Sequence, residues 1–227
     1  MIYLILIALL LLAIYGPNLW VQHVLKKHHR PLPGMPGSGS ELAQHLLKQY
    51  QLDDVAVEKS NPNEDHYSPA DNAVRLSPEV FDGKSLSAIA VAAHEVGHAI
   101  QFNRQEPVSL LRGKYLGSAH RVQRIGVVLM MFLPLLSAFI GGPRLAMLTI
   151  AVGVMTMLIS VMMYAAVLPE EWDASFNKAL PILEKGGYVP AEYLPAVKQV
   201  LTACALTYVA AALADILKLW RWLRLLR

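Results

Sequence analysis

The segment His94-Glu95-Val96-Gly97-His98 carries the strongest chemical signal in the sequence. Residues four apart lie one turn above each other on one face of a helix, so two imidazoles at this spacing can hold one Zn²⁺. Glu95 would project beside the metal, where it can take a proton from bound water. The spacing therefore predicts a zinc site for hydrolysis with His94 and His98 as ligands.

The alternative is a solvent-facing helix whose two histidines pair with a neighbouring carboxylate. The residues before the motif, 88–93, are small and apolar, which predicts a buried helix instead. Burying two histidines and a glutamate without a partner would be costly. Gly97 costs roughly 1 kcal/mol relative to Ala inside a helix, which predicts that another part of the chain approaches closely there.

The composition is typical of a membrane protein. Of the 227 residues, 55% are hydrophobic and only 16% are charged, against about 25% in soluble domains. A net charge of +3 without a basic stripe of interleaved aromatics does not predict a nucleic-acid partner. The single Cys204 excludes an intramolecular disulfide and a cysteine-rich zinc module, and we expect it to be a small packing residue.

Three apolar segments predict membrane spans. The first, within residues 1–24, precedes the positive charges Lys26, Lys27 and Arg30, whereas a cleaved signal peptide carries them before its apolar core. Residues 125–142 and 145–168 predict a membrane hairpin, because soluble helices of this length carry a polar face. The basic residues between Arg112 and Arg124 precede this hairpin. They predict a cytoplasmic catalytic region.

The last apolar stretch, Val200 to Leu219, leaves two alternatives open. It is a fourth span, with its basic tail on the far side of the membrane. Otherwise it packs on the peptidase region, with residues 217–227 as an interfacial helix. In either case Asp215 should face protein or the interface, because a carboxylate facing lipid is costly.

The region between the anchor and the hairpin predicts a small folded domain. Pro31 to Ser40 is a linker rich in Pro, Gly and Ser, and a short amphipathic helix follows. Extended pieces are expected at 55–58 and within 66–77, the latter as two pieces joined by a turn. The predicted segments of the whole chain are an anchor at 1–24, a peptidase region at 25–124, a hairpin at 125–168, a third-ligand segment at 169–199 and a last helix with its tail at 200–227.

A catalytic zinc needs a third protein ligand and one open position for water. Both ends of a membrane hairpin lie on the same side, so the segment after it returns to the zinc motif. This segment contains Glu170, Glu171 and Asp173, and a carboxylate on a short helix there would complete a His, His, Glu set. His66 and His120 are rival ligands, although each is more simply interpreted as a surface or hydrogen-bonding histidine.

Together these motifs resemble the YugP-type bacterial membrane zinc metallopeptidases. The resemblance covers nearly the whole chain and rests on residues 94–101, 65–67, 74–77, 171–175 and 205–213. The chain is more distantly similar to the HtpX-like and CAAX-type membrane peptidases, in which two histidines and a downstream glutamate hold zinc. The resemblance implies a mainly α-helical, zincin-like membrane protein with a small β element, 3–4 transmembrane helices and one zinc ion. It also implies Glu171 as the third ligand and Glu95 as the general base.

Two departures from these families affect other candidates. HtpX-like peptidases have an acidic residue four positions after the ligand glutamate, where this chain has Ser175; the acid is Asp173 instead, a candidate for supporting the ligands. The YugP-type family often has Asp after the His-Tyr pair, where this chain has Ser68. His66 and Tyr67 are candidates for stabilising the oxyanion, with structural packing as the alternative.

These predictions together indicate a zinc-dependent endopeptidase in a bacterial plasma membrane, with a peptide or protein as substrate and the lipid bilayer as its surroundings. Residues 73–76 could offer a sheet edge to that substrate, or could be internal sheet. The alternative function is a non-catalytic membrane scaffold or chaperone with a structural metal. Such a closed site would need a fourth protein ligand and would not need Glu95.

Overall fold

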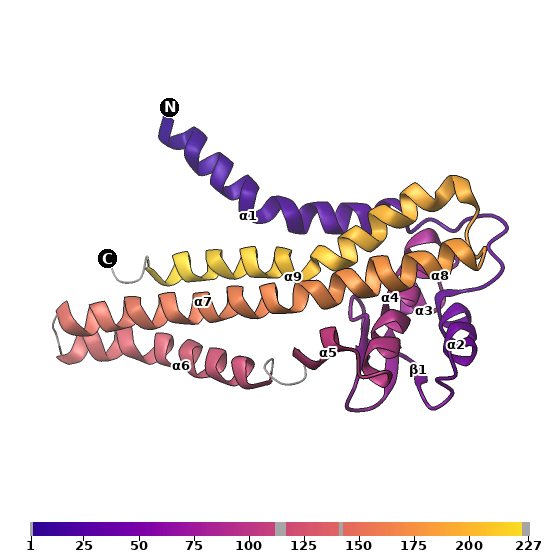
Figure 1. Cartoon of the computed structure of the whole chain (residues 1–227). Coiled ribbons are helices and arrows are strands. Elements are labelled where there is room, and N and C mark those ends of the chain that lie inside the picture. Colours follow the sequence, from indigo (N-terminus) through magenta and orange to yellow (C-terminus); the bar gives the residue numbers. More distant parts are fainter. Residues whose placement is uncertain (1, 112–116, 141–142, 224–227) are drawn as a thin grey trace. The chain divides into compact units, whose positions relative to one another are not determined.

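The computed structural model describes residues 2–111, 117–140 and 143–223 of the chain, which are mainly helical and include one small sheet (Figure 1). The elements are α1 (Ile2–Lys27), α2 (Gly39–Gln49), β1 (Ala56–Lys59), β2 (His66–Ser68), β3 (Ala73–Leu76), α3 (Pro78–Phe81), α4 (Leu86–Asn103), α5 (Pro107–Leu111), α6 (Gly117–Ile140), α7 (Pro143–Trp172), the π-helix η2 (Asp173–Ala179), α8 (Leu180–Lys185), the 3₁₀-helix η3 (Ala191–Tyr193) and α9 (Leu194–Leu223).

The chain folds as two compact units, and each is described by itself. One unit comprises residues 1–18, 111–168 and 208–227, and it contains the apolar helical segments. The other unit comprises residues 19–110 and 169–207, and it contains the sheet, α2 to α4, η2 and α8. The zinc motif and the carboxylates of 169–175 both belong to this second unit, hereafter called the peptidase unit after the region predicted from the sequence.

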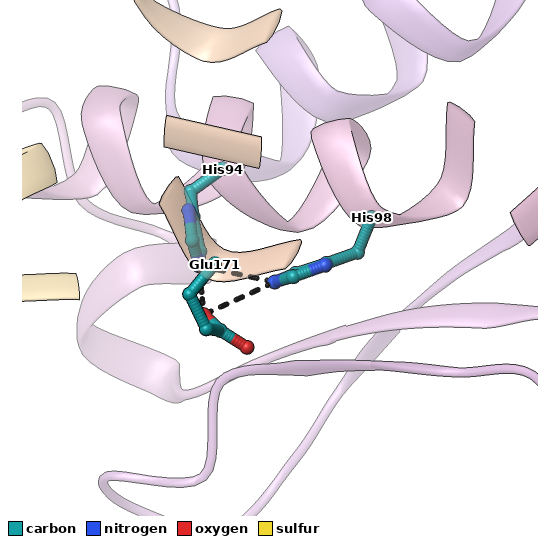
Figure 2. Close-up of side chains that lie close together, drawn as sticks. All are labelled: His94, His98 and Glu171. Carbon is teal, nitrogen blue, oxygen red and sulfur yellow. Dashed lines mark hydrogen bonds and ion pairs between the residues drawn. The ribbon is translucent and has the colours of Figure 1, made fainter. Parts of the chain in front are cut away.

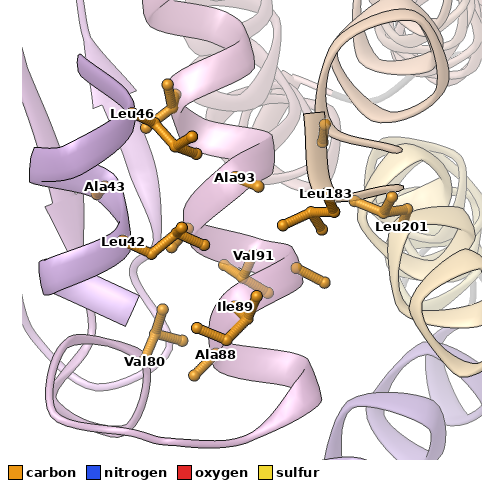
Figure 3. Packing of buried hydrophobic residues seen from close by; sticks show 14 of the residues in the cluster. Leu42, Ala43, Leu46, Val80, Ala88, Ile89, Val91, Ala93, Leu183 and Leu201 are labelled. Carbon is orange, nitrogen blue, oxygen red and sulfur yellow. The ribbon is translucent and has the colours of Figure 1, made fainter. Parts of the chain in front are cut away.

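Helix α4 is the centre of the peptidase unit. Every residue from Leu86 to Gln101 is buried, which confirms that the motif helix does not face solvent. Helix α2 packs on one side of α4 through Leu42 and Leu46, and the side chains of Leu183 and Leu201 lie on the other side (Figure 3). The small side chains of α4 allow these neighbours to approach closely: Ala88, Ala90, Ala92, Ala93 and Ala99.

The sheet has the strand order β1-β3-β2. Strand β3 pairs in parallel with β1 and antiparallel with β2, which confirms two extended pieces joined by a turn. Because both edges of β3 are occupied, residues 73–76 are internal sheet, which was one of the two alternatives, and they offer no free edge to substrate. Strand β2 packs against α4 and brings Tyr67 to the zinc motif.

One apolar helical run among the described residues, Met147–Lys185, is long and apolar enough to cross a membrane. Only 20% of its apolar window is buried, so the chain itself does not cover most of this surface. The shorter apolar stretch Arg124–Leu133 lies in α6, and Gly126 there packs against the Thr156 side chain. The side chain of Asp215, the basic residues after Leu223 and much of the predicted basic stretch before α6 lie outside the described residues.

Candidate metal centre

Three buried side chains from two distant parts of the sequence converge on one point (Figure 2). His94 and His98 lie one turn apart on α4, and their Nε2 atoms are 3.2 Å from each other. Glu171, at the end of α7, brings its Oε2 atom within 3.2 Å of His94 Nε2 and 3.3 Å of His98 Nε2. The structure thus brings together the two motif histidines and the glutamate that the resemblance singled out.

The dimensions of this cluster fit a zinc ion. Donor atoms 2.0–2.1 Å from one zinc at tetrahedral angles lie about 3.3 Å from one another. The three separations between the converging atoms of His94, His98 and Glu171 are 3.2, 3.2 and 3.3 Å. Two imidazole nitrogens and one carboxylate oxygen also form a common donor set of catalytic zinc sites.

The hydrogen bonds of Ser175 indicate which ring nitrogen of His94 carries the proton. The Ser175 hydroxyl lies 3.1 Å from the backbone carbonyl of Leu201, which can only accept a hydrogen bond. The hydroxyl therefore donates to that carbonyl and accepts from His94 Nδ1, at 3.0 Å. A proton on Nδ1 leaves the lone pair of His94 Nε2 directed toward Glu171.

The outer nitrogen of His98 faces acceptors as well. Its Nδ1 lies 3.0 Å from Gln101 Oε1 and 3.5 Å from Glu170 Oε1. Burial by itself lowers the pKa of an imidazole, but the charge of Glu171 and hydrogen bonds to Glu170 and Glu171 outweigh burial and raise the pKa of His98 to about 10. The cluster therefore attracts positive charge, which a metal ion can supply in place of a proton.

Glu95 is buried beside the cluster, and its carboxylate is held by the backbone of β2. The Tyr67 N–H donates to Glu95 Oε2 at 2.9 Å. A second carboxyl group, that of Asp65, lies near Glu95. Burial raises the pKa of Asp65, and the negative charge of Glu95 raises this pKa further. This arrangement fixes one oxygen of Glu95 and separates its role from that of the three converging side chains.

The other candidate residues occupy different places. The Tyr67 hydroxyl donates to Asn72 Oδ1 at 2.8 Å and accepts from Asn103, so its side chain is engaged away from the cluster. His66 Nδ1 lies 3.3 Å from the backbone carbonyl of Glu64. The rival His120 has its side chain outside the described residues. Asp173 accepts a hydrogen bond from Gln101 at 2.8 Å and so is connected to His98 through one side chain.

The π-helix η2 determines how the segment that carries Glu171 and Ser175 approaches α4. A Cβ atom on Gly97 would lie 2.9 Å from the Ala174 carbonyl oxygen, which confirms that another part of the chain approaches closely at this glycine. Glu171 therefore does not lie on a separate short helix; α7 continues into η2, whose wide turn is marked by the Leu180 N–H bonding to the Ser175 carbonyl.

Sequence reasoning missed Gln101, and it missed Ser175 as the partner of His94. Gln101 lies three positions after His98, and positions three apart share a face of a helix. That spacing was the available signal for Gln101. The role of Ser175 had no such signal, because it depends on the π-turn of η2 and on the carbonyl of Leu201 in α9.

Comparisons with known proteins also point to a zinc peptidase. A family model described as "Putative neutral zinc metallopeptidase" matches residues 2–227. The chain is also 35% identical over 219 residues to "Putative membrane protease YugP" of Bacillus subtilis (strain 168), an alignment that covers 94% of this chain and 93% of the relative. No solved structure matches the chain. Both similarities extend over nearly the whole chain rather than the zinc motif alone.

Proposed function

The chain belongs to this neutral zinc metallopeptidase family, and we propose that it is a membrane-embedded endopeptidase that cleaves membrane or membrane-proximal proteins. The observation that carries the proposal is the buried convergence of His94, His98 and Glu171, with the held carboxylate of Glu95 beside it. These four residues would provide a ligand set and a separate base, which are the parts that hydrolysis at a metal requires.

His94, His98 and Glu171 would hold one zinc ion through Nε2, Nε2 and Oε2. When bound, zinc would lower the pKa of a coordinated water toward about 7 and polarise the scissile carbonyl. Ser175 and Gln101 accept hydrogen bonds from the outer nitrogens of the two histidines, so both inner nitrogens keep their lone pairs for the metal.

Glu95 would serve as the general base. Its carboxylate would take the proton from the attacking water and deliver it to the leaving amine. The Tyr67 N–H holds Oε2, so the carboxylate keeps one orientation while the other oxygen is available for the proton. Burial in a site of low dielectric strengthens these interactions, since water does not screen them.

We further propose a multi-pass arrangement in the plasma membrane. Spans within 1–24, 125–142 and 145–168 would place the peptidase unit on the cytoplasmic side, because Lys26, Lys27 and Arg30 follow the first span. Val200 to Leu219 would form either a fourth span or a helix packed on the peptidase unit. The relative from Bacillus subtilis is named a membrane protease, which supports the location in a membrane.

The position of Glu95 favours an enzyme over a scaffold with a structural metal. Glu95 is buried and held by Tyr67, yet it is not one of the three converging side chains. A structural site would have no use for an additional held carboxylate. The test is hydrolysis of an unstructured protein by the purified full chain in nanodiscs, with a chelator and with zinc added back. Loss and recovery of cleavage are expected; metal binding without cleavage would favour the scaffold.

The proposed topology is tested separately. Single cysteines near Ser60 and near Gly142, introduced after replacing Cys204 by Ala, should differ in labelling by a membrane-impermeant reagent applied to intact cells. We expect labelling near Gly142 and protection near Ser60. Labelling of the Ser60 region from outside would contradict a cytoplasmic peptidase unit without affecting the assignment of the zinc ligands.

A further inference from the structure

Gln101 is fully buried on α4, and all three hydrogen bonds of its side chain lead to the metal centre. Its Oε1 atom lies 3.0 Å from His98 Nδ1. Its Nε2 atom donates to the backbone carbonyl of Glu170 at 3.0 Å and to Asp173 Oδ2 at 2.8 Å. One side chain on α4 therefore contacts a proposed ligand and the backbone next to another proposed ligand.

The partners of Gln101 determine which way its amide group points. A backbone carbonyl only accepts hydrogen bonds, and the Asp173 carboxylate, which also accepts from Lys178 at 3.0 Å, does the same. The NH₂ group must therefore face Glu170 and Asp173, which leaves the amide oxygen facing His98. Because that oxygen is an acceptor, the proton of a neutral His98 lies on Nδ1 and its Nε2 lone pair is directed into the cluster.

We infer that Gln101 is a positioning residue that couples the two histidines of α4 to Glu171 at the end of α7. This inference rests on the proposed zinc site. Through Oε1 it sets the tautomer and ring orientation of His98. Through Nε2 it holds the end of α7 against α4, so that Glu171 arrives opposite the two histidines. Supporting hydrogen bonds of this kind change metal affinity even though they do not touch the metal.

Asp173 is itself held in place, which makes it a firm anchor for Gln101. It accepts from Asn177 at 2.7 Å and from Lys178 at 3.0 Å, and Lys178 also pairs with Glu106 at 2.9 Å. The contacts from His98 through Gln101, Asp173 and Lys178 to Glu106 are therefore continuous.

Glu170 offers His98 a second acceptor, but at 3.5 Å rather than the 3.0 Å of Gln101. The Glu170 side chain cannot replace the hydrogen bond that Gln101 donates to the Glu170 backbone carbonyl. Removing Gln101 should therefore disturb the centre even if Glu170 keeps the proton of His98 on Nδ1. The effect of removing Gln101 therefore tests whether this residue holds α7 against α4, and not only whether it sets the tautomer of His98.

The test is Co²⁺ binding by the full chain in nanodiscs, measured by the visible spectrum and by competition with a chelator. Gln101→Met keeps the side-chain length but removes all three hydrogen bonds, and Gln101→Glu keeps only the acceptor for His98. For both variants we expect the Co²⁺ dissociation constant to rise about 10- to 100-fold, with an altered spectrum. Gln44→Met, at an exposed position of α2, is the matched control and should bind as the wild type does.

The outcomes separate this inference from the proposed function. Wild-type protein that fails to bind Co²⁺ would refute the zinc site and this inference together. Wild-type affinity and spectrum in Gln101→Met, or in Gln101→Glu if the Met variant does not fold, would overturn only the role of Gln101. In a double-mutant cycle, Asp173→Ala should add little to Gln101→Met, because both changes break the same link. Fully additive losses would contradict that link.

Discussion

Helix α4 and the apolar part of α7 are both rich in apolar residues, but the structure places them in opposite surroundings. Every residue of α4 from Leu86 to Gln101 is buried, whereas Met147, Met155 and Met162 of α7 are 57% to 70% exposed. The apolar residues of α4 are mostly small and fit against other elements of the peptidase unit. The exposed residues of α7 are large and flexible, and the proposed membrane span would bring them into contact with lipid.

The polar residues of the two helices differ in the same way. Thr156 of α7 donates to the Val152 carbonyl one turn earlier in the same helix, and its side chain lies against Gly126 of α6. On α4, His94 bonds with Ser175 and Gln101 bonds with Asp173, both in η2. A hydrogen bond within one helix does not determine how that helix packs against another element. A polar group satisfied by another element fixes how two elements pack, which is what a metal centre requires.

The change expected to have the largest effect is Glu95→Gln. If the polar residues of α4 serve chemistry and not only packing, this variant should lose hydrolysis by about 10²- to 10⁴-fold, the typical contribution of a general base. The amide oxygen of the introduced glutamine can still accept from the Tyr67 N–H, so folding and metal content should persist. Peptidase rate and zinc content of the same sample test this. Turnover close to that of the wild type would contradict a catalytic role for the polar residues of α4, because Glu95 would then serve packing alone.

The next largest effect is expected from Glu171→Gln, which removes the carboxylate charge at the centre. Metal affinity should fall by more than the roughly 10- to 100-fold typical of losing a supporting hydrogen bond. Glu170→Gln is the matched control, because it changes the neighbouring buried glutamate and retains an oxygen that can accept from His98 Nδ1. Metal analysis in which Glu170→Gln loses more zinc than Glu171→Gln would reverse the assignment of the ligand.

Much of α4 could be predicted from its sequence because its periodicity and its function coincide. The spacing of His94 and His98 places both on one helix face, and the small apolar residues before them indicate burial. Gly97 predicted a close approach, and the backbone of Ala174 occupies that space. Local spacing carries this information, so no knowledge of the remaining chain was needed.

The supporting contacts could not be predicted because they depend on where distant backbone groups come to lie. The Tyr67 N–H reaches Glu95 only because β2 is an edge strand against α4. Ser175 meets His94 only because η2 makes a π-turn, and a short α-helix was expected there. The place of residues 73–76 in the sheet stayed open for the same reason. Their sequence predicts a strand, but the order of strands in a sheet is a long-range property.

A smaller effect is expected from Gly97→Ala, which tests how tightly the metal centre is packed. A Cβ atom there would meet the backbone of Ala174, and backbone moves less readily than the end of a side chain. We expect a loss of roughly 1–3 kcal/mol in stability from overpacking, accompanied by weaker metal binding as η2 and Glu171 shift. Thermal unfolding and metal competition measure the two effects.

Gly126→Ala is the control from the other unit. A Cβ atom there would crowd the β-branched Thr156 side chain, so the contact between α6 and α7 would have to shift. Because residues 126 and 156 belong to the unit that does not contain the metal centre, metal binding by Gly126→Ala should be unchanged even as the pairing of α6 with α7 weakens. Equal losses of metal affinity in the two variants would show that the peptidase unit does not hold its centre independently of the apolar helices.

The smallest effect is expected from Ser175→Ala, which removes the acceptor of His94 Nδ1. The ring of His94 remains packed within α4, so its position should change little, but its Nδ1 proton loses the hydroxyl that assigns the tautomer. Metal affinity should fall about tenfold, the lower end of the range for such supporting contacts. Ser40→Ala removes another buried serine hydroxyl, bonded to Ser38 at 3.0 Å and outside the centre, and should leave affinity unchanged. Identical Co²⁺ affinities for the two variants would mean that packing alone orients His94, and the hydrogen bonds that distinguish α4 from α7 would then matter on the Gln101 side of the centre only.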